Sequence, residues 1–189
     1  MMCYLRLHKK ATAGVTLIEL MVAIAILAIL LVLATPSLQK ITRDNRVTTQ
    51  SNELVALINL TRNEAIRLGI DATDAEEAVL RLNSTVSGWT GNVSVTDANP
   101  AEDCPSNVIR CSENARVQLS ATANALSFES RGYLDMESMG KTAWTPELIC
   151  LKHMDGCKGD RQHIEIKVLP SGQTETRRLQ CDAACPPAE

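Results

Sequence analysis

Aromatic side chains are scarce in this sequence. Its 189 residues include two Trp, two Tyr and one Phe, 3% of the total. Aromatic rings supply large contact areas in protein cores and flat platforms on which bases and sugars stack. The chain therefore has few surfaces for stacking, and its globular part must build its core from Leu, Val, Ile and Ala.

A second long apolar run is also missing. Residues 15–34 read VTLIELMVAIAILAILLVLA, with Glu19 as the single charge. No other stretch approaches the roughly 18 apolar residues that a membrane span requires, which excludes a multi-pass membrane protein. A helix of about 20 residues is about 30 Å long and matches the hydrocarbon thickness of a bilayer. Residues 15–34 can therefore span a membrane, and a wholly soluble protein is disfavoured.

Acidic residues are absent before this run, where Arg6, Lys9 and Lys10 stand. The positive-inside bias predicts that residues 1–13 stay in the cytoplasm and that the C-terminal part lies outside. A secretory signal peptide is disfavoured, because the apolar core exceeds the usual length of about 7–15 residues and ends without a small-x-small cleavage site.

A plain signal anchor does not explain Glu19. A carboxylate this deep in a membrane costs roughly 2.5–3.5 kcal/mol even on lenient insertion scales, so an intramembrane acid is by default a functional hypothesis. The ordinary alternative is that Glu19 snorkels toward the cytoplasmic interface from its place near the helix start.

The segment AGVTLIEL, residues 13–20, resembles the processing site of type IV pilins and type II secretion pseudopilins. The resemblance implies that a prepilin peptidase cuts between Gly14 and Val15, methylates the new amine and leaves the apolar helix on the mature protein. Glu19 and Pro36 then take the family's places for an acid and a helix-bending proline. Val15 departs from the Phe that is usual in the family.

Processing would give Glu19 a partner. A cut chain carries a cationic amine on Val15, and a neighbouring subunit in a filament can bring that amine to the Glu19 carboxylate. Each charge is costly in lipid and much less so when paired. We therefore expect the pair to drive subunits together and to fix their axial register.

Beyond Pro36, the sequence predicts an α+β protein. Apolar residues keep an approximate helical period up to a C-cap at Gly69, and Pro36 should bend this helix because it lacks an N–H. These residues are Leu38, Ile41, Val47, Leu54, Leu57, Ile58, Ala65 and Leu68. Residues 86–180 are predicted to form strands, because segments such as 93–95 and 164–168 alternate apolar and polar side chains and turn clusters such as 170–172 lie between them.

The resulting architecture is a pilin-like, long N-terminal helix, transmembrane in its first half, packed on a C-terminal antiparallel β-sheet or sandwich domain with disulfides. Residues 74–80 also allow a short extra helix. The expected parts are a leader (1–14), a transmembrane helix (15–35), its amphipathic continuation (36–69) and a periplasmic β-rich domain (70–189).

Several segments resemble the FimT/GspH branch of pilin-like proteins. They are TRNEAIRLG (61–69), the Gly-Trp strand GWTGNVSVTD (88–97), the Phe-x-x-x-Gly hairpin LSFESRG (126–132), Cys150 with the strand IEIKV (164–168), and the turn at 171–172. The resemblance implies a minor pilin or pseudopilin rather than an enzyme, built into a type IV pilus or a type II secretion pseudopilus. Its implied partners are other pilins or pseudopilins, an inner-membrane assembly platform and the prepilin peptidase.

Six of the seven cysteines would remain after Cys3 leaves with the leader. An even number in an exported domain implies three disulfides, with 15 possible connectivities. Short spacing favours Cys104–Cys111. The other four leave two alternatives open, which are Cys150–Cys157 with Cys181–Cys185, or Cys150–Cys181 with Cys157–Cys185.

Histidine and cysteine at short spacing also suit zinc. Cys150, His153, Cys157 and His163 could form such a site, but an oxidising compartment and the other cysteine pairs favour disulfides. Neither His153 nor His163 falls in a recognisable catalytic motif. We therefore expect no metal, no cofactor and no catalysis, and we expect both histidines on the surface.

The charge of the mature chain argues against a general nucleic-acid surface. Without the leader it would carry 16 basic and 22 acidic residues, a net charge of −6. Some members of the FimT branch bind DNA through a Gly-Arg-x-Arg element, and the matching place reads GQTETRR (172–178). Arg177 and Arg178 are thus possible DNA contacts in a DNA-uptake minor pilin, or simply a solvated strand face. A further alternative is an unprocessed single-pass protein with a periplasmic domain.

Overall fold

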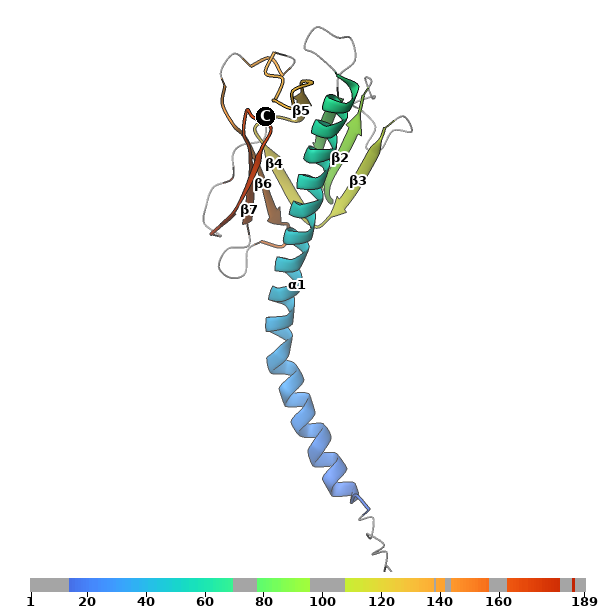
Figure 1. The fold of residues 1–189 in the computed structure, drawn as a ribbon. Coiled ribbons are helices and arrows are strands. Elements are labelled where there is room, and N and C mark those ends of the chain that lie inside the picture. The colour runs from blue at the N-terminus through green and yellow to red at the C-terminus, as the bar shows by residue number, and fades with distance from the viewer. Residues whose placement is uncertain are drawn as a thin grey trace, which may run out of the picture. The chain divides into compact units, whose positions relative to one another are not determined.

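The computed structural model describes residues 14–69, 78–95, 108–137, 139–141, 144–156, 163–180 and 185. Contacts within the chain divide it into two units, Met1–Gln39 and Lys40–Glu189. One helix, α1 (Leu17–Leu68), begins in the first unit and ends in the second (Figure 1). The described strands all belong to the second unit.

Gly69 ends α1. Its φ of 67° lies in the left-handed region, which glycine adopts without a steric cost, and its N–H donates to the Ile66 carbonyl at 3.3 Å. The C-cap predicted at this glycine is confirmed.

In the second unit, α1 buries one face at the predicted spacing of three and four residues. Its buried residues are Val47, Gln50, Ser51, Leu54, Leu57, Ile58, Thr61 and Ala65. The helical period also includes Leu38, Ile41 and Leu68, which are exposed by 62%, 52% and 40%. Buried packing of α1 thus begins at Val47, and periodicity alone cannot locate where the strands start to cover a helix.

The described strands form two antiparallel sheets, which confirms the α+β class. Sheet A has the strand order β3-β2-β1-β5, and sheet B has the order β4-β6-β7-β8. The bounds are β1 Ala78–Ser84, β2 Gly88–Ser94, β3 Arg110–Ala115, β4 Val117–Ala121, β5 Ala125–Phe128, β6 Glu147–His153, β7 His163–Val168 and β8 Thr174–Leu179.

Two local expectations have different outcomes. The short helix considered for residues 74–80 is wrong over its described part, because Ala78 begins β1, which pairs with β2 and β5. The turn expected before β8 is confirmed, since Gly172 has a φ of 76° and its N–H donates to the Leu169 carbonyl at 2.8 Å.

The core lies between α1 and both sheets. Its members come from α1 and from strands of sheets A and B, and they are mostly Leu, Val, Ile and Ala, as the composition predicts. Two aromatic side chains join them, Trp89 and Phe128, each 1% exposed. The Trp89 indole N–H donates to the Gln50 side-chain oxygen at 3.0 Å, and the Gln50 amide donates to the Ala115 carbonyl at 3.0 Å. Gln50 therefore fastens α1 to sheet A.

Candidate functional site

The predicted processing junction is exposed just before α1. Gly14 has open space where a side chain would stand, and Val15 is 71% exposed. Thr16 precedes the helix, and its hydroxyl accepts a hydrogen bond from the Glu19 N–H at 3.3 Å. This is the arrangement of an N-cap, which satisfies one of the free donors of the first turn.

Thr16 is a residue that sequence reasoning missed, although its signal was present. Ser or Thr followed three residues later by Glu, directly before an apolar run, is the pattern of a capping box. The pattern gives Glu19 a local environment as well, because the positive end of the helix dipole stabilises an acid in the first turn. Thr16 and Glu19 therefore define where α1 begins.

Glu19 stands among apolar side chains. Ile18, Val22, Ala23 and Ile26 line a shallow groove with it along the helix surface. The carboxylate is thus held one turn from Val15 on a surface that otherwise offers no polar partner within the groove. Because the other side chains of this groove are apolar, none of them would compete with a cation for the Glu19 carboxylate.

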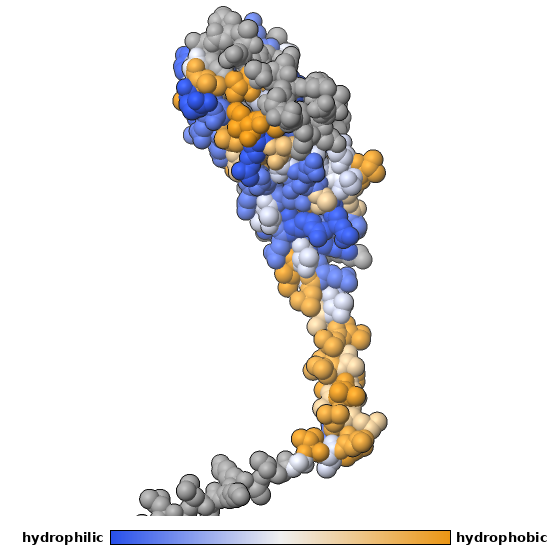
Figure 2. Space-filling model, turned by 90° about the vertical axis from the view of Figure 1, so that its right-hand side faces the viewer, coloured by the Kyte–Doolittle hydropathy of each residue, from blue (hydrophilic) through white to orange (hydrophobic). Residues whose placement is uncertain are grey.

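The apolar stretch is hydrophobic around its whole circumference. Its large hydrophobic residues from Val15 to Leu33 are between 52% and 76% exposed. Figure 2 shows the apolar side chains on the surface of this stretch. Among the described residues, α1 is the helix that is long and apolar enough to cross a membrane. Burial of each such side chain contributes about 1.5–3 kcal/mol, so a bilayer or partner helices must cover them.

Pro36 lies inside α1. Its ring nitrogen cannot donate to the carbonyl four residues earlier. The preceding Thr35 donates its hydroxyl to the Leu31 carbonyl at 2.7 Å, a side-chain bond that often accompanies bends in helices. The bend at Pro36 stays a prediction.

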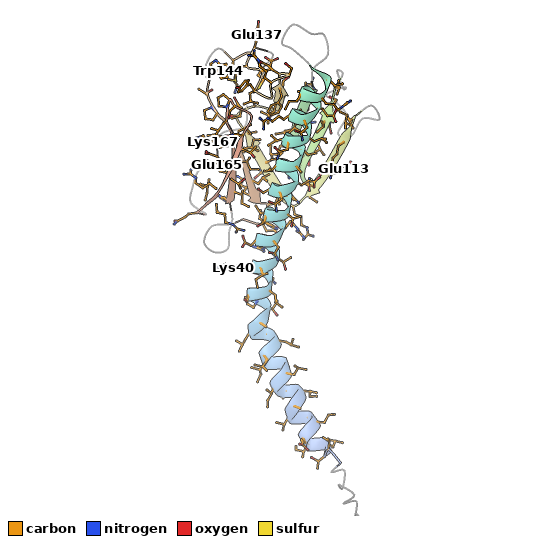
Figure 3. All side chains as sticks on the ribbon, in the orientation of Figure 1. Lys40, Glu113, Glu137, Trp144, Glu165 and Lys167 are labelled. Atoms are coloured by element: carbon orange, nitrogen blue, oxygen red, sulfur yellow. A yellow bond between two sulfur atoms is a disulfide. The ribbon has the colours of Figure 1, made fainter. Side chains whose placement is uncertain are left out.

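The two candidate DNA-contacting arginines both have carboxylate partners. Arg177 lies 3.0 Å from Glu165 on the neighbouring strand β7, a residue labelled in Figure 3. Arg178 lies 2.7 Å from Asp44 and donates to the Thr48 hydroxyl at 2.9 Å, both on α1. These contacts fasten β8 to β7 and to the helix. A DNA contact stays a prediction that no described contact favours.

The cysteine connectivity differs from both open alternatives. Cys150 forms a disulfide with Cys185, with the Cα atoms 5.7 Å apart. Both alternatives for Cys150 are therefore wrong. Cys111 is also disulfide-bonded, but Cys104 lies outside the described residues, as do Cys157 and Cys181, so the Cys104–Cys111 pair stays a prediction.

The register of sheet B explains the Cys150–Cys185 bridge. Cys150 on β6 is opposite Glu165 on β7, which is opposite Arg177 on β8. Cys150 therefore lies on the face of the sheet that carries these charged residues, yet it is fully buried. Cys185 follows β8 in the sequence, whereas Cys150 lies on β6, which is separated from β8 by β7. Spacing in the sequence cannot reveal a pairing across the sheet.

The expectation that His153 and His163 lie on the surface is wrong. They are 4% and 9% exposed. His153 ends β6, and its Nδ1 accepts a hydrogen bond from the Asp155 N–H at 3.2 Å. Burial lowers the pKa of His153 below 6.5, the Asp155 carboxylate raises it, and nearby arginines lower it further. The alternation of β6 turns His153 inward with Ile149 and Leu151. His163 instead shares its face of β7 with Glu165 and Lys167, so alternation does not explain its burial.

The described residues show no group of three or more His, Cys, Asp or Glu side chains that could hold a metal ion. Cys150, which the zinc alternative requires, is engaged with Cys185 instead.

Comparison with protein-family models identifies the chain. Residues 50–172, well over half of it, match the family described as type II transport protein GspH. The chain belongs to the GspH family. Residues 9–35 of this GspH-family protein match the prokaryotic N-terminal methylation motif, which covers the predicted junction and the apolar helix. No curated protein and no solved structure matches the chain significantly.

These matches have a functional consequence. A GspH-family chain with an N-terminal methylation motif is a minor pilin or pseudopilin, of a type II secretion system or a type IV pilus. The fold described above is accordingly pilin-like. Such families are structural, they assemble with other pilins, and a prepilin peptidase processes them. The N-terminal motif and the apolar helix fit a membrane-anchored subunit.

Proposed function

We propose that this GspH-family protein is a filament subunit that a prepilin peptidase cuts between Gly14 and Val15 and that acts without catalysis of its own. Residues 1–14 are the leader, 15–35 anchor the waiting subunit in the inner membrane, 36–69 continue the helix, and 70–189 form the periplasmic domain. The N-terminus lies in the cytoplasm, because basic residues without acids precede the span.

One observation carries this proposal. The apolar stretch of α1 is exposed all around, and its single acid, Glu19, lies one turn from an exposed junction. Lipid can bury the apolar side chains of such a helix before assembly, and other apolar helices can bury them afterwards. A free Val15 amine of a neighbouring subunit then supplies the charge that Glu19 lacks in its groove.

The assembly is proposed to be a type II secretion pseudopilus or a type IV pilus, delivered by an inner-membrane assembly platform. The family's description as a type II transport protein favours the pseudopilus. Assignment to the FimT branch rests on the sequence resemblance.

The intact mass of the isolated protein tests the processing step. Coexpression with a prepilin peptidase should remove residues 1–14 and add one methyl group to Val15, while Gly14→Leu should leave the chain at full length. A full-length parent chain in the presence of an active peptidase would favour an unprocessed single-pass protein instead.

The Glu19 carboxylate has its own test. We predict that Glu19→Ala still inserts into the membrane and is still cut, yet fails to enter filaments, because the Val15 amine of the next subunit has no partner. Sheared filaments and membranes can be compared by immunoblotting, with Thr35→Ala as a control on the same helix. Normal incorporation of Glu19→Ala would remove the pairing role and leave the snorkelling interpretation.

A further inference from the structure

Basic side chains gather at the end of the second unit where α1 enters it. Lys40, Arg43 and Arg46 lie on α1, and Arg116 lies between β3 and β4. Figure 3 labels Lys40, which projects from the helix below the strands. Arg43 Nη2 lies 4.0 Å from Asp155 Oδ2, and the Arg116 carbonyl accepts a hydrogen bond from the Met154 N–H at 3.1 Å. Basic residues from two parts of the fold thus come close to the end of β6.

In the part of the chain that the structure describes, acidic residues compensate this basic cluster only weakly. Asp155 Oδ2 lies 4.0 Å from Arg43 Nη2, whereas the nearby Asp44 is engaged with Arg178. Within the described ranges, Lys40, Arg46 and Arg116 form no ion pair. Arg43 Nη1 is buried without a hydrogen-bond partner among the same residues. Counted over the described residues, the cluster therefore keeps an excess of positive charge and an unused donor.

The cluster follows the proposed span closely along the chain. Lys40, Arg43 and Arg46 come five, eight and eleven residues after residue 35 in the sequence. Basic residues that follow a span this closely are attracted to anionic lipid headgroups over about one Debye length, which is about 8 Å at physiological salt.

We propose that Lys40, Arg43, Arg46 and Arg116 bind the phosphate groups of anionic phospholipids in the leaflet next to the globular unit. Arginine suits this ligand because its planar fork of donors matches phosphate oxygens. A bound phosphate would neutralise the excess charge and offer an acceptor to Arg43. The contact would hold the subunit at the membrane surface before assembly. This lipid-binding proposal rests on the membrane anchoring in the proposed function. It does not depend on cleavage after Gly14 or on the role of Glu19.

Native mass spectrometry of the full chain in detergent tests the proposal. The parent protein should retain phosphatidylglycerol in preference to phosphatidylcholine when both are added at equal concentration. The variant Arg43→Gln/Arg46→Gln/Arg116→Gln should lose this preference by fivefold or more, since each basic residue near an anionic surface changes binding by roughly fivefold. Arg67→Gln/Arg110→Gln/Arg131→Gln, with the same change in net charge at other exposed positions, should retain it.

A second variant keeps the test usable if the triple variant fails to fold. Arg46→Gln/Arg116→Gln removes no ion pair of the described residues and should still weaken the preference severalfold. An unchanged preference in either cluster variant would overturn the proposal. Displacement of the lipid by an equal concentration of inorganic phosphate would overturn it too, because the ligand would then be a free anion.

If the triple variant kept its lipid preference but no longer entered filaments, the cluster would be a contact between subunits instead. This result would also overturn the proposal. Alkaline extraction of membranes separates this inference from the proposed function. A chain that resists extraction but shows no lipid preference contradicts the lipid site alone, whereas a chain released by alkali contradicts the membrane anchor.

Discussion

At the scale of single residues, the burial of His153 links stability to pH. Its pKa is lowered, first by burial and then by the surrounding arginines, although Asp155 raises it. As the pH falls toward 6.5 and below, the unfolded chain takes up a proton at this residue before the folded chain does. The unfolded state therefore binds more protons, and the free energy of unfolding falls as the pH falls through this range.

His153→Asn should remove this dependence. Asparagine can still accept the hydrogen bond of the Asp155 N–H, but it does not titrate. The variant should lose less stability than the parent between about pH 7.5 and 5.5. Urea unfolding of the full chain in detergent, followed by tryptophan fluorescence, measures the difference. If the free energy of unfolding of the parent and of the variant changed equally with pH, His153 would not contribute to the pH dependence.

A buried carboxylate gives the second residue-scale prediction. Glu147 is 1% exposed, and it accepts hydrogen bonds from Lys141 Nζ and the Thr122 hydroxyl, both at 2.6 Å. Lys141→Met leaves the charge with a single neutral donor and should cost about 2–3 kcal/mol. The double variant Lys141→Met/Glu147→Gln removes the charge as well and should recover part of that loss. A double variant with a free energy of unfolding no higher than that of Lys141→Met would contradict this view.

At the scale of elements, two glycines with the same backbone conformation should respond differently to substitution. Gly140 and Gly172 have φ values of 68° and 76°. A Cβ at Gly140 would meet open space, whereas one at Gly172 would collide with the Gly132 carbonyl oxygen and the Arg62 side chain. Arg62 already donates to that carbonyl at 2.9 Å, so it cannot withdraw without losing the bond.

We predict that Gly140→Ala costs about 1–2 kcal/mol, the price of the left-handed conformation alone. Gly172→Ala should cost at least about 1 kcal/mol more, because backbone atoms must shift to relieve the contact. Thermal unfolding of the two variants under the same conditions gives the comparison. Equal losses would mean that the turn before β8 moves freely away from α1.

The elements also show which parts of the fold a sequence can predict. The apolar run and Gly69 were enough to predict the position of the helix. The run is a local signal for a membrane span, and the glycine is a local signal for a helix end. The period of α1 identified its buried face from Val47 to Ala65, but it included Leu38 and Ile41, which are exposed. Burial depends on where strands distant in the sequence come to lie, and a periodic pattern carries no information about that. The histidines were misjudged for the same reason.

At the scale of the whole molecule, the sequence shows the spacing of the proposed N-terminal site. It does not show the partners of Cys150, Arg177 and Arg178. Gly14, Glu19 and Pro36 lie within one short segment, so their spacing is visible in the sequence, and even Thr16 left a capping pattern there. The pairing of Cys150 with Cys185 links β6 to a residue beyond β8, and the order of the strands in sheet B is not visible in the sequence. The partners of Arg177 and Arg178 likewise depend on tertiary packing.

The same bridge gives the last prediction. Cys150 and Cys185 are 35 residues apart in sequence, so the link closes a loop that the unfolded chain would otherwise leave open. The chain-entropy model gives about 3–4 kcal/mol for a loop of this length. Cys150→Ala/Cys185→Ala should lower the free energy of unfolding by about that amount, with the larger effect on β8, which is an edge strand of sheet B.

Two measurements check this prediction. Urea unfolding gives the loss of stability, and hydrogen exchange should show faster exchange in residues 174–179 than in β6, whose two neighbouring strands remain. A non-reduced digest of the parent protein should contain the peptide pair that joins Cys150 to Cys185. A pair that joins Cys150 to Cys157 or Cys181 would contradict the connectivity.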